Sequence, residues 1–496
     1  MKNRSLGLNA FLNGLKSILN LLFPLITFPY VSRVLGVKGV GIYNYSNSIV
    51  SYFLLIAALG ISTYAIREGA KYRDNKEQIN KFASEVFTIN IWSTLVSYVL
   101  LLACLVIFTN LHDYISCILI FSIQIFFTTL GTEWIYSIYE DYAYITIRSI
   151  IFQVISLILL FIFVRNKNDY LNYAAITVFS SIGSSIFNFV HARAFVKIRL
   201  TWHIPWKYHI VPILVIFASN VAIMIYVSSD ITILGIMKNT YVVGLYSVAA
   251  KVYTIVKNLL SSLLIVTVPR LAMLMGKRRM NEYNQVLTRV TNMLLLFTLP
   301  AMTGLFMLSK GVILIISGRP FLAATPSLQI LCLALIFSLF SWVISDCVLI
   351  PAKREKLVLI GTVISAILNI VLNIVLIPFW SEKAAALSTV VAEASMMFFN
   401  LYFARDIIKS IITSKDFKNN LLSSVVGCGG IILICWLCDI GWQNWIPKIV
   451  LSVVLSIGIY GAILVFLKNT TIYSVINNIK NKITELSENI SNKYSE

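Results

Sequence analysis

Apolar runs long enough to cross a membrane recur along the whole chain, and they constrain its fold more than any motif does. An α-helix needs about 20 apolar residues to span the hydrocarbon core of a bilayer. The runs predict about fourteen spans, centred near residues 20, 54, 96, 126, 155, 182, 222, 256, 297, 337, 367, 394, 430 and 457. A cleaved signal peptide or a single anchor does not account for runs that continue to the end of the chain. The sequence therefore predicts an all-α integral membrane protein.

Composition and charge agree with this prediction. Of the 496 residues, 58% are hydrophobic and only 12% are charged, which leaves too few polar side chains to cover a soluble domain. The net charge is +19, but the basic residues lie in short segments between apolar runs, so no nucleic-acid partner is expected. Lys and Arg are concentrated in alternate loops, on the side that carries both chain ends. The positive-inside rule therefore predicts that both termini are cytoplasmic.

Two pairs of similar segments indicate an internal repeat. The segment SRVLGVKGVGIYNYSN, residues 32–47, resembles ITILGIMKNTYVVGLYSVA, residues 231–249, because each has Leu-Gly and then Gly-aliphatic-Tyr. TEWIYSIYEDYAYITIRSII, residues 132–151, resembles SDCVLIPAKREKLVLIGTVI, residues 345–364, as a charged turn between two spans. An even number of spans separates the members of each pair, which favours a parallel repeat of two six-helix lobes plus two C-terminal spans. The expected domains are 1–200 and 201–410 for the lobes, 411–468 for the last two spans, and 469–496 for a cytoplasmic amphipathic tail.

Charged side chains inside predicted spans are the main candidate functional residues. A Lys or Asp at the centre of a span costs about 2.5–3.5 kcal/mol on insertion scales, so it should face a protein interior, a cavity or an interface. Lys16, Lys251 and Lys257 are the candidate cations; Lys257 is more central than Lys251, and Lys16 can also reach the membrane surface. Glu393 is a candidate to carry a proton or to pair with a lysine. Asp230, near the end of its span, is a second candidate for ion coupling, with a solvated or salt-bridged end as the alternative.

Other polar groups give no sign of a metal or cofactor. The four histidines lack zinc-binding spacing, and Cys435 and Cys438 form a C-x-x-C inside an apolar run, where packing explains them better than redox chemistry. The glycines at 36, 39 and 41 follow no strand, so they indicate a turn rather than a nucleotide-binding loop. We expect no metal site and no cofactor.

Several segments resemble a known family. FPLITFPYVSRVLGVKGVGIYNYSNSIVSYF, ALGISTYAIREGAKYRD, TEWIYSIYEDYAYITIRSI and LNIVLNIVLIPFWSEKAAALSTVVAE are similar to the Wzx-type polysaccharide flippases of the multidrug/oligosaccharidyl-lipid/polysaccharide exporter superfamily. The resemblance implies two lobes with fourteen spans in the cytoplasmic membrane of a bacterium. It also implies a cargo: an oligosaccharide on undecaprenyl pyrophosphate, moved to the outer leaflet. A pyrophosphate needs cations in its cavity, which Lys16, Lys251, Lys257 and the span-edge Arg33 and Arg67 could supply.

Alternatives remain at this stage. A drug and cation exporter of the same superfamily is the nearest, but it needs a buried acid in the first span, where this chain has Lys16. A membrane-embedded polymerase needs a large outer loop, which is not predicted. A lipid II or teichoic-acid precursor flippase shares the polyprenyl pyrophosphate handle and stays open.

We therefore expect a transporter and not an enzyme, with membrane lipids, an H⁺ or Na⁺ counter-ion and polysaccharide polymerase machinery as further partners. Arg33 and Arg67 have topology or headgroup contact as their alternative role.

Overall fold

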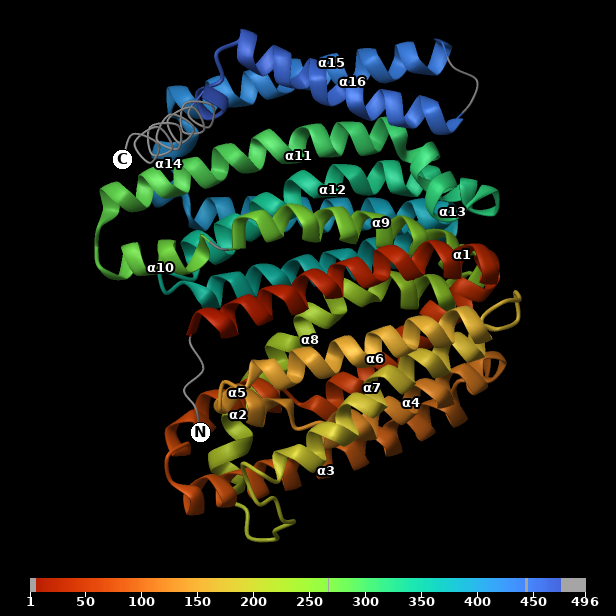
Figure 1. Ribbon diagram of the computed structural model, residues 1–496, viewed down its shortest axis with the longest axis vertical. Coiled ribbons are helices and arrows are strands. Elements are labelled where there is room, and N and C mark those ends of the chain that lie inside the picture. Colours follow the sequence, from red (N-terminus) through yellow and green to blue (C-terminus); the bar gives the residue numbers. More distant parts are fainter. Residues whose placement is uncertain (1–5, 266, 442–444, 474–496) are drawn as a thin grey trace, which may run out of the picture. The chain divides into compact units, whose positions relative to one another are not determined.

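The computed structural model describes residues 6–265, 267–441 and 445–473, and for residues 6–22, 263–264 and 445 it describes the backbone alone (Figure 1). All regular structure in the described chain is helical. The N-terminal half contains α1 (Leu6–Ala58), α2 (Ile61–Gly69), η1 (Ala70–Tyr72), α3 (Lys76–Ile107), η2 (Thr109–Tyr114), α4 (Ile115–Leu130), α5 (Glu133–Ile138), α6 (Tyr142–Phe163) and α7 (Tyr170–Ala192). The remainder contains α8 (Trp206–Met237), α9 (Thr240–Ile265), α10 (Val268–Gly276), α11 (Met280–Ile316), η3 (Arg319–Ala324), α12 (Thr325–Val343), the π-helix η4 (Ile344–Leu349), α13 (Glu355–Phe403), α14 (Arg405–Ile412), α15 (Lys415–Gly441) and α16 (Trp445–Phe466).

Eleven helical segments of the described chain are long and apolar enough to cross a membrane. Two of the long helices, α1 and α13, are each two helices joined at a kink, at Gly36 and at Ser381. The 26-residue helix α9 lies outside the eleven. The all-α multi-pass fold is therefore confirmed, and the number fourteen stays a prediction.

The order of the elements repeats along the chain. In the first half, two long helices are followed by short α2, long α3, the 3₁₀ turn η2, α4, short α5, and α6 and α7. In the second half, α8 and α9 are followed by short α10, long α11, the 3₁₀ turn η3, α12, the π-helix η4, and the two parts of α13. This agreement supports the parallel repeat that the paired segments indicated.

The second pair of segments builds the same helix end twice. At the end of α5, Glu140 has a left-handed backbone (φ 57°), and the N–H of Asp141 donates to the carbonyl of Tyr136 at 3.0 Å. After η4, Lys353 has φ 60°, and the N–H of Arg354 donates to the carbonyl of Leu349 at 2.8 Å. Both are Schellman caps, in which a left-handed residue turns the chain back and satisfies the last carbonyls of the helix. In each copy the next helix begins one residue later.

The first pair of segments packs against itself. A Cβ on Gly41 would lie 1.7 Å from the carbonyl oxygen of Thr240, and a Cβ on Gly244 would lie 2.0 Å from that of Val37. The two backbones thus cross in direct contact, as small residues permit in membrane helices. The leading glycines of the pair differ in role. Gly36 lies at the kink with φ 64° and open space around it. Of the three glycines for which a turn was predicted, at 36, 39 and 41, Gly36 alone interrupts α1.

The chain divides into two compact units. Unit 1 comprises Met1–Val248, Ile316–Ala324 and Ala366–Ala385; unit 2 comprises Ala249–Ile315, Thr325–Ser365 and Ala386–Glu496. A core in unit 1 joins α2, α3, α5 and the start of α8 around Tyr64, Trp134 and Tyr136. A core in unit 2 joins α10, α11, α12 and η4 with α14, around Tyr283 and Leu339. The expected domain limits at 200, 410 and 468 stay predictions, and most of the expected tail lies outside the described residues.

Candidate functional site

The helices α9 and α13 bring together two of the predicted site residues in unit 2. The Lys257 ammonium lies 2.9 Å from a carboxylate oxygen of Glu393, and the Tyr253 hydroxyl donates to the same oxygen at 3.3 Å. Tyr253 and Lys257 are four residues apart, so they occupy one face of α9. The Lys257 ammonium also lies 5.7 Å from the centre of the Tyr253 ring. Glu393 comes from the part of α13 that follows the kink at Ser381.

The two charges of this pair differ in exposure. The Glu393 side chain is 7% exposed, whereas that of Lys257 is 30% exposed. A buried carboxylate is costly unless it is paired, so Glu393 depends on Lys257 for its counter-charge. Because the Lys257 side chain is partly exposed, it can offer an anion a contact that the buried carboxylate cannot. This arrangement suits reversible binding of a phosphate-bearing ligand.

An apolar cavity occurs in the same unit. It holds about 850 Å³ of empty space including its opening, and its lining residues come from α11, α12, η4, α13, α14 and α15. Thr291 is its one hydroxyl-bearing lining residue, and the rest are aliphatic, aromatic or Met side chains. The lining residue Met397 lies one helical turn after Glu393. Such a cavity suits hydrocarbon and offers nothing to a sugar or a charged group.

Asp230 lies in a separate polar cluster in unit 1. It is 5% exposed and accepts hydrogen bonds from the Tyr246 hydroxyl and, at 2.6 Å, from the Asn373 amide. The amide oxygen of Asn369 accepts from Asn373 at 3.0 Å and from Ser229 at 2.8 Å. The solvated helix end considered as an alternative is wrong, because α8 continues to Met237 and the carboxyl is buried. A buried carboxyl beside amide oxygens can hold a proton or a hard monovalent cation.

The other predicted cations whose side chains the structure describes, Arg33, Arg67 and Lys251, lie outside these clusters. Arg33 is exposed, lies on α1 three residues before the kink at Gly36, and is close to Gly318. Arg67 is 57% exposed and pairs with Glu68 at 3.2 Å. Because Arg67 lies on α2, the helix 37–58 separates it from Arg33. Lys251 is half-buried and has no ion pair within the described part of the chain. The Lys16 side chain lies outside the described residues, so its predicted role stays a prediction.

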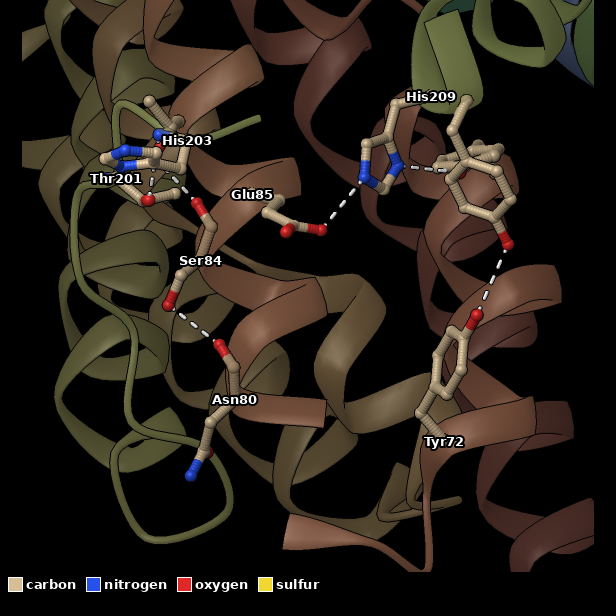
Figure 2. Close-up of polar contacts among 10 residues, drawn as sticks. Tyr72, Asn80, Ser84, Glu85, Thr201, His203 and His209 are labelled. Carbon is tan, nitrogen blue, oxygen red and sulfur yellow. Dashed lines mark hydrogen bonds and ion pairs between the residues drawn. The ribbon is translucent and has the colours of Figure 1, made fainter. Parts of the chain in front are cut away.

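Sequence reasoning missed several buried polar partners. Asn369 and Asn373 are four residues apart in an apolar run, and this spacing was a signal for a polar helix face. The spacing of the histidines says nothing of their buried partners, yet His209 bonds to Glu85 (Figure 2). Its other ring nitrogen lies 2.8 Å from the Tyr64 hydroxyl. Clusters of three or more His, Cys, Asp or Glu that could hold a metal ion do not occur among the described residues.

Comparison with known proteins identifies the family. Residues 6–275, more than half of the chain, match the family described as polysaccharide biosynthesis protein. The chain belongs to this family. A relative named "Putative O-antigen transporter" from Escherichia coli (strain K12) is 24% identical over 263 residues, which are 51% of this chain and 61% of the relative. Its counterpart of the same name from Shigella dysenteriae is 23% identical over 388 residues, 77% of this chain and 96% of the relative.

Solved structures agree on the fold. A structure described as lipid II flippase MurJ in an inward closed conformation is 19% identical, with a TM-score of 0.75, and the match covers 93% of this chain and 99% of that chain. An inward-facing multidrug MATE transporter of the MOP superfamily is 13% identical with a TM-score of 0.60, covering 79% and 96%. At these identities the likeness shows the fold alone. Together with the family match, it confirms the resemblance to Wzx-type flippases of this superfamily. The relatives are transporters and not enzymes, in agreement with the prediction from the sequence.

Proposed function

We propose that this protein is a flippase for an undecaprenyl-pyrophosphate-linked oligosaccharide, which it moves from the inner to the outer leaflet of a bacterial cytoplasmic membrane. The product would serve a surface polysaccharide such as capsule, exopolysaccharide or O-antigen. Family membership and the names of the two relatives support the cargo class. The observation that carries the proposal is the partly exposed Lys257 side chain, whose ammonium pairs with the buried carboxylate of Glu393. The distribution of Lys and Arg supports cytoplasmic termini.

The geometry of this pair suggests how binding is coupled to an ion. A pyrophosphate that reaches Lys257 competes with Glu393 for the ammonium. Once the ammonium turns to the phosphate, Glu393 is a buried carboxylate without its counter-charge, and it takes up a proton. Release of the cargo restores the ion pair and expels the proton. Asp230, surrounded by the amide groups of Asn369 and Asn373, is the second candidate to carry H⁺ or Na⁺.

The membrane potential adds to this coupling. It acts on any net charge that crosses, at about 2.3 kcal/mol per charge for each 100 mV. In an alternating-access cycle the exposed Arg33 and Arg67 would meet the anionic cargo or lipid headgroups near the two ends of the helix 37–58. The polyprenyl tail would remain in lipid. Polymerase machinery would act on the glycan after it has crossed.

A leaflet assay tests the proposal. In cells depleted of the protein, a membrane-impermeant glycan label is applied before and after permeabilisation. The mass of the labelled lipid is then measured by mass spectrometry. We expect polyprenyl-pyrophosphate-linked glycan to accumulate on the cytoplasmic side, and its mass will separate an oligosaccharide unit from lipid II or a teichoic-acid precursor. Normal display outside with polymer missing would refute the proposal in favour of a later step.

A matched set of variants tests the role of Lys257. The double variant K257A/E393Q removes both charges, so it avoids a lone buried carboxylate and should reach the membrane at the wild-type level. We expect it to lose export when complementing depleted cells, while K277A, at an exposed lysine between α10 and α11, retains it. Normal export by the double variant would remove Lys257 from the binding site without excluding a flippase.

A further inference from the structure

The segment between α7 and α8 lies extended along α3 instead of crossing open space (Figure 2). We refer to residues 193–205 as the connector. The backbone N–H groups of Lys197, Arg199 and Thr201 donate to side chains of α3. These bonds use only backbone donors of the connector, and the side chains of Lys197 and Arg199 are exposed. The acceptors of the three N–H groups are, in the same order, Asn80 at 2.8 Å, Ser84 at 3.1 Å and Thr88 at 3.1 Å.

The spacing of these bonds follows from the two geometries. Four residues along a helix rise about 6.0 Å, and two residues of extended chain rise about 6.6 Å. Acceptors at every fourth position of α3 therefore match donors at every second position of the connector. Successive side chains of an extended chain point to opposite faces, so Ile198 and Leu200 lie on the face opposite to Lys197 and Arg199. The connector is therefore an amphipathic strip that α3 holds along one edge.

Two tryptophans mark one end of this strip. Residues 82–90 of α3 are all buried, whereas Trp92 and several apolar residues that follow it are exposed. The ring of Trp202, on the connector, lies 6.2 Å from the ring of Trp92, centre to centre. Tryptophan rings are enriched where headgroups meet hydrocarbon, so this pair indicates that boundary. Ser84, which binds the N–H of Arg199, lies about 12 Å along the helix from Trp92, on the side away from the exposed apolar stretch. Arg199 is thus on the headgroup side of the tryptophans.

The segment from the connector to the first turn of α8 is basic and contains no acid. Residues 193–209 include no Asp or Glu, and their exposed basic side chains are Arg193, Lys197, Arg199 and Lys207. None of these four forms an ion pair with a residue that the structure describes. Glu85, on the covered part of α3, is 8% exposed and bonds to Nε2 of His209 at 3.0 Å. The four positive charges are therefore available to an anion from outside the chain.

Charge alone does not explain this segment. A solvated loop, or a site for a free phosphate ion, would suit the basic side chains but not the neighbouring Leu200 and Trp202, whose exposed fractions are 67% and 82%. Large apolar side chains exposed beside clustered Lys and Arg are typical of segments that lie in the interface of an anionic bilayer. A phospholipid offers a phosphate to the cations and hydrocarbon to the apolar side chains.

We propose that the connector and the first turn of α8 form a binding surface for anionic phospholipids in the leaflet that they face. The phosphates bind the four basic side chains, and Leu200 and Trp202 contact the upper part of the acyl chains. The three bonds to α3 keep this surface in one position on the helix. The site is separate from Lys257 and Glu393, and the proposal holds whatever cargo the protein carries.

Quenching of tryptophan fluorescence by brominated lipids tests the proposal on the full-length protein in nanodiscs. The discs contain equal parts of phosphatidylcholine and phosphatidylglycerol, and one lipid or the other carries bromine near the headgroup end of its acyl chains. The difference between the wild-type protein and W202F isolates the signal of Trp202. We expect phosphatidylglycerol to be preferred at Trp202 by about fivefold or more, which is what one Lys or Arg near an anionic surface contributes. The preference should weaken as salt is added.

A charge-neutralised variant tests which side chains bind the phosphate. R193Q/K197Q/R199Q/K207Q removes the four charges and keeps the bonds to α3, because the connector donates them from its backbone. We expect its preference, measured against its own W202F derivative, to fall to about one. The matched control K356Q/K409Q/K415Q/K418Q removes four exposed lysines of α13, α14 and α15, and it should keep the wild-type preference.

Each other outcome would contradict the proposal. Equal quenching by the two lipids in the wild-type protein would mean an interfacial segment without a site for anions. No quenching of Trp202 by either lipid would mean that the connector faces water or another protein. A preference that persists in the charge-neutralised variant, or that is lost in the control, would remove the basic side chains of this segment from the site.

Discussion

Replacement of Gly41 by Ala should be among the most damaging single substitutions in unit 1. The new Cβ would lie 1.7 Å from the Thr240 carbonyl oxygen, whereas carbon and oxygen atoms in close contact are about 3.3 Å apart. The two backbones would have to separate by about 1.5 Å, because a backbone carbonyl in a helix cannot relieve a clash by changing rotamer as a side chain can. Overpacking by a single methyl group commonly costs about 1–3 kcal/mol. Because this clash is with backbone, we expect more than about 4 kcal/mol.

The assay compares G41A with a glycine that has space. A Cβ on Gly304, inside α11, would meet no neighbouring side chain or helix within 4 Å among the described residues, so G304A should be neutral or stabilise by about 0.5–1 kcal/mol. We would measure membrane level and the midpoint of thermal aggregation in detergent, by fluorescence-detected size exclusion. G244A, 2.0 Å from the Val37 carbonyl oxygen, should resemble G41A. The double variant G41A/G244A should cost less than the sum, since the first methyl already separates the same backbones. A midpoint for G41A equal to that of G304A would refute the crossing.

Three further substitutions test local features. D406N should lower stability near neutral pH by less than about 1 kcal/mol, because both partners are partly exposed. The hydrogen bond from the Arg354 guanidinium lowers the pKa of Asp406, so this contribution is present above the ordinary pKa of Asp and is lost as the pH falls through the lowered pKa. The thermal midpoints of the two proteins should therefore differ at neutral pH and converge only as the pH falls below about 4, and a difference that stays constant at low pH would contradict this. K353G should increase the free energy of unfolding by about 0.5–1 kcal/mol and so raise the thermal midpoint, since glycine adopts the left-handed backbone without strain. A lower midpoint would show that the contacts of the lysine side chain stabilise the protein more than the relief of strain does. N373A should destabilise by about 1–3 kcal/mol because Asp230 loses a buried donor, and an unchanged midpoint would mean that the cluster rearranges.

Much of the fold could be predicted from the sequence because the bilayer imposes one length and one kind of secondary structure on every span. The repeat was also visible, since both copies carry Leu-Gly followed by Gly-aliphatic-Tyr, and both carry a charged turn between two spans. The separate candidates Lys257 and Glu393 could be named because charge is costly inside a span. Their pairing could not, since it depends on how α9 packs against α13, and no local pattern in the sequence encodes that packing.

The attachment of the connector was hidden for a different reason. Asn80, Ser84 and Thr88 are ordinary polar residues on one face of a helix, and the groups they bind are backbone N–H groups, which every residue except proline has. Their role becomes visible only when the extended connector is placed beside α3. His209 and Glu85 lie far apart in the sequence, and each alone is a common residue near the end of a span.

The contact of Gly41 with Gly244 has a consequence for dividing the gene. The first half of the repeat contributes Val37 and Gly41, and the second half contributes Thr240 and Gly244. If the chain were divided at residue 200, each coexpressed fragment would contain one of the two contacting backbone segments. Assembly would then require the two segments to associate inside the bilayer. A cut in the loop between α10 and α11, near Arg278, would instead leave that crossing within a single fragment. The second cut is therefore the better starting point for a split version of the protein.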